Sequence, residues 1–447
     1  MKKLVEFWTQ HRSDLLALGV LTIWCVGVLG PALWFVPTDG DDLTQLSAVA
    51  LTANPLAFFT ANTPIPNSPF RPLSFISQWL VYQFAGVSGL PNQAINLALH
   101  ILCMALLYRL LRKSKLDPLL ALALSATVAV APYTLMPAVW VAARPALLVA
   151  LMLLLVLNAL NVTASTDELA PTVVTARNLP MQITLLIVCS VVALLSKESG
   201  VVVPAFAAVF ALALPRGAWR ARSALIAAAM MIFVFYVIIR AVLLPVNTGV
   251  MVHTGFLWGI QQYSNWAALP PSQQALAILT NLASLVIAPW LMIFGELGQL
   301  LSPSDALSLA GCAISTLALV GLCAKARLTR LQIYALVLIG LNALAHFTIF
   351  RYRELYTAQI AIALFVAGAA ALRANANRRG WALGILIALL FFNSLWVTRS
   401  INWQAIVRYD NLRYLAVNVA QNTLPSLYDR STVEMVLQRY AGWLHVK

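Results

Sequence analysis

Long apolar segments alternate along the chain with short polar ones, and this alternation predicts a helical membrane protein. Most of the apolar runs are about 16–23 residues long, the length that an α-helix needs to cross a bilayer; barrel strands are shorter and alternate in polarity. The pattern predicts eleven spans, near 14–36, 92–111, 118–136, 145–162, 180–196, 199–215, 223–243, 304–324, 331–350, 355–372 and 380–398. The expected fold is an all-α bundle whose first span, after Met1, acts as an uncleaved signal anchor.

The segments between and after these spans define the expected domain organisation. An apolar segment at 276–295 contains a proline, and we expect it to be re-entrant or to lie on the membrane surface. The long first loop, 37–91, contains an aromatic segment at 72–85 that is typical of an interfacial helix. Residues 1–398 then form one transmembrane domain, and 399–447 form a small, weakly amphipathic tail.

Composition supports the membrane assignment and excludes a nucleic-acid role. The chain is 61% hydrophobic and 10% charged, with mean hydropathy +0.83; a soluble domain is about 25% charged. The net charge of +14 is dispersed between the spans, as expected for cytoplasmic loops, and it places the N-terminus in the cytoplasm. Five cysteines lie in or beside apolar segments without metal-binding spacing, so we interpret them as packing residues.

An acidic pair, Asp41 and Asp42, follows the first span in a chain that is poor in acids. Only 15 of 447 residues are Asp or Glu. A carboxylate at the mouth of a membrane bundle suits a general base or a metal ligand, whereas the alternative is a capped turn, which Asp also favours. Binding of a divalent metal ion by this pair is therefore an alternative that the sequence leaves open.

A second group of charges lies at the outer ends of the predicted spans, where the positive-inside bias predicts few cations. It consists of Arg71, Arg144, Lys197, Arg240, Arg351 and Arg353, with Glu198 and Glu354 nearby. Such a cluster suits a phosphate at the level of the lipid headgroups, and the alternative is snorkelling to those headgroups.

Two further polar motifs lie near the predicted outer face. Asn92, Asn96 and His100 recur every four residues and therefore share one helical face, which forms either a cavity lining or an interhelical hydrogen-bond stripe. The segment 196–200, Ser-Lys-Glu-Ser-Gly, predicts a tight turn between two spans.

These motifs, in this order, resemble the GT-C superfamily of membrane glycosyltransferases, and in particular the TPR-containing transmembrane O-mannosyltransferases and their bacterial relatives. The resemblance covers about 35–370. It rests on Asp41-Asp42 with Asn54-Pro55, Arg71-Pro-Leu-Ser-Phe75, Asn96-Leu-Ala-Leu-His100, Ala143-Arg-Pro-Ala-Leu-Leu148, Ser196-Lys-Glu-Ser-Gly200, Tyr236-x-x-x-Arg240 and Arg353-Glu-Leu-Tyr356. In two departures from the family, Ala146 stands where the family has Asp, and the TPR tail is replaced by about fifty residues.

The resemblance implies an inverting transfer from a polyprenyl-phosphate-linked sugar to a periplasmic acceptor, at the outer face of a bacterial inner membrane. Asp41 is the expected base and Asp42 orients it or is the alternate base. The donor phosphate is expected at Lys197, Arg240 and Arg353, with Arg71, Arg351, Arg144 and Tyr356; His100, Asn96 and Glu198 are expected to line the cavity. The alternatives are a glycan ligase or polymerase that uses a diphosphate donor, and a transporter.

Overall fold

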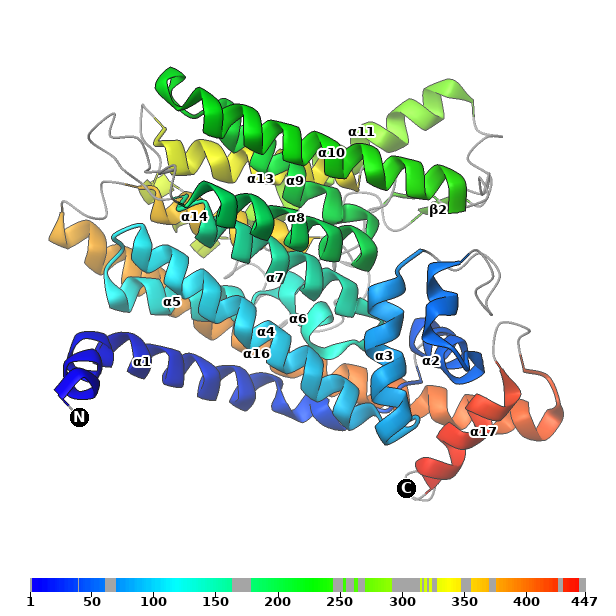
Figure 1. Ribbon diagram of the computed structural model, residues 1–447. Coiled ribbons are helices and arrows are strands. Elements are labelled where there is room, and N and C mark those ends of the chain that lie inside the picture. The colour runs from blue at the N-terminus through cyan, green and yellow to red at the C-terminus, as the bar shows by residue number, and fades with distance from the viewer. Residues whose placement is uncertain are drawn as a thin grey trace.

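The computed structural model is a bundle of helices (Figure 1) and describes most of the chain. It describes residues 2–38, 40–60, 70–162, 178–243, 252–254, 261–263, 270–291, 314–315, 317–319, 321–323, 328–346, 355–369, 375–424 and 429–441. Within these residues the strands are β1 (Val252–Thr254) and β2 (Gln261–Tyr263), which pair antiparallel. The all-α expectation is therefore confirmed apart from this short hairpin.

The helices follow one another in an order that matches the predicted spans closely in the first half of the chain. They are α1 (Lys2–Leu29), α2 (Gly40–Leu51), α3 (Pro72–Ala85), α4 (Gly89–Lys113), α5 (Pro118–Ala129), α6 (Pro132–Val139), α7 (Arg144–Ala159), α8 (Leu179–Ser196), α9 (Val202–Leu212), α10 (Trp219–Leu243), α11 (Pro271–Leu291), α13 (Arg330–Ala345), α14 (Tyr356–Ala367), α16 (Ala376–Gln421) and α17 (Arg430–Arg439). Short 3-10 helices are η1 (Gly30–Trp34), η2 (Pro55–Phe59), η3 (Val141–Ala143), η4 (Glu198–Val201) and η5 (Arg216–Ala218).

The chain is a multi-pass membrane protein. Among the described residues, six helices are long and apolar enough to cross a bilayer, or seven if the bent pair α5–α6 is one span. Three expected spans appear as shorter apolar helices, Glu198–Leu212, Arg330–Ala345 and Tyr356–Ala367. The expected span at 304–324 lies largely outside the described residues, so the count of eleven stays a prediction.

The expected span at 118–136 is broken, which corrects the prediction of a continuous helix. The axes of α5 and of 133–139 differ by 69°. Pro132 lacks an N–H and disfavours the helical conformation of Ala131, whose φ and ψ are −66° and 144°. The carbonyls exposed by the break are satisfied by side chains: Thr134 donates to Val128 and His100 contacts the oxygen of Ala129, as a buried break requires.

The described parts of the first loop, with α2 and α3, form a cap at one end of the bundle. Helix α3 has the bounds expected for the interfacial helix, and α2 was not expected. Leu43 faces one small core, with Leu412 and Val433, while Leu46 and Val49 face a second core beneath α3. These apolar residues of α2 recur at helical spacing, and their packing holds the cap between the bundle and the C-terminal helices.

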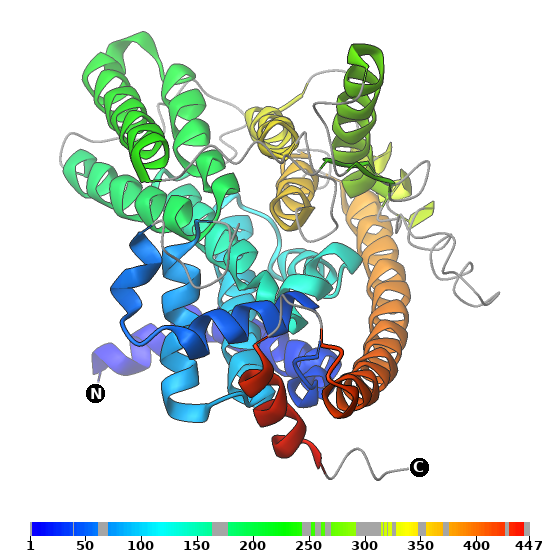
Figure 2. The ribbon, with the colours of Figure 1, turned by 90° about the vertical axis from the view of Figure 1, so that its right-hand side faces the viewer.

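Helix α16 runs without a break for 46 residues and crosses the expected boundary at 398. Figure 2 shows it on the side of the bundle away from α9 and α10, with its C-terminal part beside α17. Helix α17 packs in turn against α2. The described part of the tail is therefore mostly helical and lies on the same cap as the first loop.

Candidate functional site

The acidic pair lies in the first turn of α2, where the two carboxylates have different environments. Asp41 is exposed, and Asp42 is fully buried. Adjacent positions on a helix point about 100° apart, so one can face the interior while its neighbour faces out. The N-terminal end of a helix also favours negative charge. The structure therefore separates the two acids into an accessible one and an anchored one.

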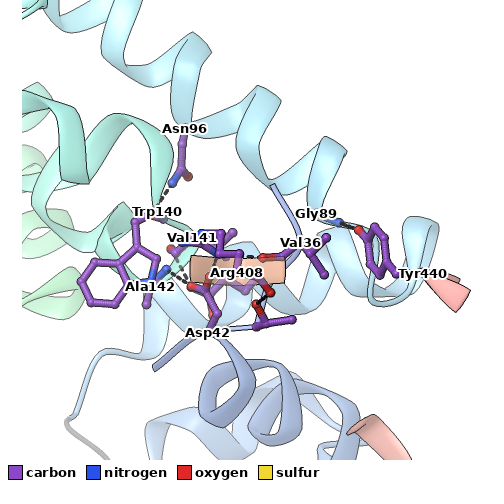
Figure 3. A network of polar contacts seen from close by, with 11 residues as sticks. Val36, Asp42, Gly89, Asn96, Trp140, Val141, Ala142, Arg408 and Tyr440 are labelled. Carbon is purple, nitrogen blue, oxygen red and sulfur yellow. Dashed lines mark hydrogen bonds and ion pairs between the residues drawn. The ribbon is translucent and has the colours of Figure 1, made fainter. Parts of the chain in front are cut away.

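Asp42 is held by both of its carboxylate oxygens (Figure 3). Oδ1 accepts a hydrogen bond from the backbone N–H of Ala142 at 3.0 Å, and Oδ2 accepts one from Nη1 of Arg408, also at 3.0 Å. Arg408 is only 4% exposed, and its Nη1 also donates to the carbonyl of Val36 at 2.8 Å. Its guanidinium lies 5.2 Å from the ring centre of Phe35. A buried ion pair thus joins α2, the end of the first span, α16 and η3.

The backbone N–H that donates to Asp42 belongs to a turn formed by residues 140–144. Side chains from three helices hold this turn in place. Asn96 donates to the carbonyl of Trp140 at 2.8 Å, Gln78 to Val141 at 3.3 Å and Gln45 to Ala142 at 3.5 Å. Gln78 also donates to Gln45 at 2.6 Å. The 140–144 turn therefore fixes the relative positions of α2, α3 and α4 at the beginning of α7.

Arg144 points into this polar core rather than toward solvent. It is fully buried, and four of its N–H groups are used: Nε by Asn96 at 2.8 Å, Nη1 by Ser77 at 3.2 Å and Nη2 by the side chain and backbone of Asn92 at 2.8 and 3.1 Å. A guanidinium has five such donors. Its partners are thus protein groups, which fits a role in holding the 140–144 turn better than a grip on a phosphate.

Lys197 and Tyr356, both expected at the donor phosphate, line the same small pocket. Lys197 is 5% exposed and follows the last residue of α8, while Tyr356 begins α14. The other lining residues are Ala146, Val149, Ser199, His346 and Thr357. The pocket thus contains an ammonium group, which suits an anion. Ala146, where the resembled family carries an acid, adds no negative charge to it.

The pocket and the acidic pair lie at the same end of the bundle. Ala142, which binds Asp42, precedes Ala146 of the pocket wall by four residues, or roughly 6–8 Å along the chain. Arg71, before α3, pairs with Glu198, directly after Lys197, at 3.0 Å. Both groups are partly exposed, so this pair contributes little to stability, but it connects the cap to the pocket.

His100 acts on the pocket through Tyr356. Its Nε2 lies 3.0 Å from the carbonyl of Ala129, and its Nδ1 lies 2.8 Å from the hydroxyl of Tyr356. A carbonyl only accepts, so the proton is assigned to Nε2, and the neutral ring accepts from the tyrosine at Nδ1. Asn92, Asn96 and His100 are all buried, and the first two belong to the hydrogen-bond core of Arg144.

Three of the expected phosphate ligands are not described by the structure. Arg351 and Arg353 lie outside the described residues, as does Glu354, and Arg240 lies in α10 with its side chain not described. Their roles stay predictions. Sequence reasoning missed Arg408. The signal was available, because the buried positions Ile401, Arg408, Leu412 and Leu415 recur at helical spacing and include one cation.

A metal ion fits the acidic pair poorly. Both oxygens of Asp42 already accept hydrogen bonds, and one of them faces the positive charge of Arg408. Within the described part of the chain, no group of three or more His, Cys, Asp or Glu residues comes together as metal ligands.

No protein-family model matches the sequence, and no curated protein matches it. Among solved structures, the chain is similar to the oligosaccharyltransferase AglB of Archaeoglobus fulgidus in complex with an inhibitory peptide and a dolichol-phosphate (14% identity, TM-score 0.49, 95% of this chain and 61% of that chain). It is also similar to the Archaeoglobus fulgidus oligosaccharyltransferase tethered to an acceptor peptide containing the NVT sequon (14% identity, TM-score 0.45, 91% and 57%). The chain thus spans about three fifths of these longer proteins.

Proposed function

We propose that the chain is an inverting membrane glycosyltransferase that moves a sugar from a polyprenyl-phosphate donor to an acceptor on the outer face of a bacterial inner membrane. The observation that carries the proposal is the pairing of an exposed acid with a cationic pocket at one end of the bundle. Asp41 is accessible beside the anchored Asp42, and the pocket of Lys197 and Tyr356 begins one helical turn along α7 from the residue that Asp42 binds. The resemblance of the sequence motifs to the GT-C superfamily adds to this argument.

The two groups supply the two kinds of assistance that an inverting transfer needs. The acceptor oxygen forms a bond to the anomeric carbon while its proton passes to the carboxylate of Asp41. The bond between the anomeric carbon and the phosphate oxygen breaks, and its electron pair leaves with the polyprenyl phosphate. The ammonium of Lys197 stabilises the charge that develops on that phosphate.

The side chains around them hold these groups in place. Arg144, with Asn92 and Asn96, fixes the 140–144 turn, and Asp42 attaches the first turn of α2 to it. His100 fixes the hydroxyl of Tyr356. Such preorganisation reduces the reorganisation that the reaction itself would require.

The proposal is tested with purified protein in lipid nanodiscs and a radiolabelled sugar on a polyprenyl monophosphate. Asp41→Asn should reduce turnover by roughly 10²–10⁴-fold, the contribution of a general base, while donor binding is retained. Asp410→Asn, which changes an exposed aspartate on α16, is the matched control and should keep wild-type turnover. Near-normal turnover of Asp41→Asn would remove Asp41 from the mechanism.

The same assay separates the proposal from the ligase or polymerase alternative. A polyprenyl-diphosphate sugar is supplied in parallel with the monophosphate. Turnover with the monophosphate alone supports the proposed donor, whereas turnover with only the diphosphate would favour the ligase or polymerase. Transfer to neither, combined with uptake of a sugar lipid into sealed vesicles, would favour the transporter.

A further inference from the structure

We propose that Arg408, far along the chain on α16, is a positioning residue that determines which way the first turn of α2 faces, and so where Asp41 presents its carboxylate. The inference rests on the proposed function of Asp41. The contacts that carry it are those between Arg408, Asp42 and the end of the first span (Figure 3). Arg408 itself touches no reacting group in this proposal.

Asp41 and Asp42 differ in their rotational position around α2. Asp42 and Asp41 are neighbours on a helix, so their side chains point about 100° apart. Fixing Asp42 inward on Arg408 and Ala142 therefore leaves Asp41 facing outward, as observed. Without the inward anchor, rotation of the first turn would move both carboxylates together.

Arg408, which anchors Asp42, is itself held by the chain that precedes α2. Arg408 binds the carbonyl of Val36 at 2.8 Å, and its own backbone carbonyl accepts a hydrogen bond from Thr38 at 2.8 Å. Two contacts therefore tie α16 to the chain just before α2. Because α16 continues the last membrane span, Arg408 fixes the orientation of α2 relative to the helical bundle.

The contact between Asp42 and Arg408 is a buried ion pair and not an apolar contact. A buried ion pair is poor evidence for stability, because apolar residues of similar size pack as well without desolvating two charges. The pair also keeps an unused donor, since the Nε of Arg408 is buried and finds no hydrogen-bond acceptor among the described residues. An apolar pair would join the helices but would not fix a direction, whereas the ion pair does.

The experiment reads the orientation of position 41 without using enzyme activity. Asp41→Cys is labelled with an impermeant thiol reagent, with Arg408 intact and in Arg408→Gln, in the full-length protein in nanodiscs. We expect a severalfold change of labelling rate on Arg408→Gln. Ala53→Cys, at an exposed position beyond α2, reports general loosening and should be unaffected. Arg413→Gln, an exposed arginine on the same helix, is the matched control substitution.

Unchanged labelling of the Asp41→Cys thiol in folded Arg408→Gln protein would overturn the inference. If that variant does not fold, the double variant Asp42→Asn with Arg408→Gln removes both charges of the ion pair together, so that neither is left buried without its partner. The same change in labelling rate is expected there, and a wild-type rate would again overturn it.

Transfer measurements on protein with the native Asp41 keep the two proposals distinguishable. Arg408→Gln should lower kcat by roughly 10- to 100-fold, as misplacement of a reacting group does, with the KM for the donor unchanged. Arg408→Lys, which keeps the charge without the fork, should recover part of kcat. Full kcat in Arg408→Gln together with an inactive Asp41→Asn would overturn the positioning role and leave the function standing. If the wild-type protein transfers no sugar, the function fails and the labelling alone decides the positioning role.

Discussion

Removing Arg144 should reveal a strong coupling to Asn96 if the buried polar core holds the 140–144 turn as described. Arg144→Met leaves the acceptors on Asn92 and Asn96 buried without a donor, which costs about 1–3 kcal/mol for each group. It also removes a buried charge whose desolvation opposed folding. These effects have opposite signs, so the stability of the single variant does not measure the interaction.

A double-mutant cycle isolates the interaction. Asn96→Leu also loses the bond from Asn96 to the carbonyl of Trp140 at 2.8 Å, but that loss occurs with and without Arg144 and cancels. The remaining Nε to Oδ1 bond is 2.8 Å long, charged and fully buried. Hydrogen bonds to charged groups contribute about 1.5–3 kcal/mol, whereas neutral bonds between membrane helices average about 0.6 kcal/mol. We therefore expect a coupling free energy of about 1.5–2 kcal/mol.

The free energy of unfolding is measured by detergent titration of wild type, both single variants and the double variant. The neutral pair Gln45 and Gln78, at 2.6 Å, provides the control cycle, with Leu at both positions and an expected coupling of about 1 kcal/mol. A coupling below about 0.5 kcal/mol for Arg144 and Asn96, the range in which independent sites are additive, would refute the structural role assigned to this core.

Three further outcomes are expected. Gly200→Ala should destabilise the protein by about 1–3 kcal/mol in the same titration, because its Cβ would lie 2.3 Å from a backbone atom of α8; Gly217→Ala, with open space around it, should stay within about 0.5 kcal/mol. Partial burial raises the pKa of Asp429, but hydrogen bonds from two hydroxyls and two backbone N–H groups outweigh it and hold the pKa below its ordinary value. The contribution of Asp429 to stability is therefore fully present above its ordinary pKa and is lost as pH falls through the lowered pKa. Protection of the α17 amides from hydrogen exchange should fall at that lower pH in wild type. Equal acid sensitivity in Asp429→Asn would contradict this prediction. Finally, cysteines introduced on 399–421 should be labelled by an impermeant reagent from outside and one near Arg220 only after permeabilisation; the reverse would invert the topology.

The hydrophobic pattern predicted the bundle well because helices in a membrane are specified by length and polarity. It identified the long spans and the bounds of α3. It missed the break at Pro132, because the apolar run continues across it, although the proline was a readable signal. It also missed α2, whose apolar residues Leu43, Leu46 and Val49 recur at helical spacing within the long first loop.

The site was predictable as a set of residue types but less so as a set of partners. The motif order pointed to Asp41, Lys197 and Tyr356, and the structure brings the last two to one pocket. It did not predict that Arg144 would be enclosed by side-chain amides or that Asp42 would pair with Arg408, 366 positions away. Such pairings depend on tertiary packing, and neither residue's local sequence contains that information.

The length of α16 has a consequence for the height of the chemistry above the membrane. Forty-six residues of α-helix extend about 69 Å, whereas the hydrocarbon core is about 30 Å thick. Arg408 lies ten residues beyond the expected end of the last span, or about 15 Å along the helix axis, and polar headgroups occupy roughly the first 5–8 Å of that distance. The length of the helix therefore sets the distance of Arg408 from the end of the last membrane span. Its unbroken backbone places the acidic pair at a defined distance beyond the hydrocarbon, the level at which the proposed lipid-linked phosphate and water-borne acceptor would meet.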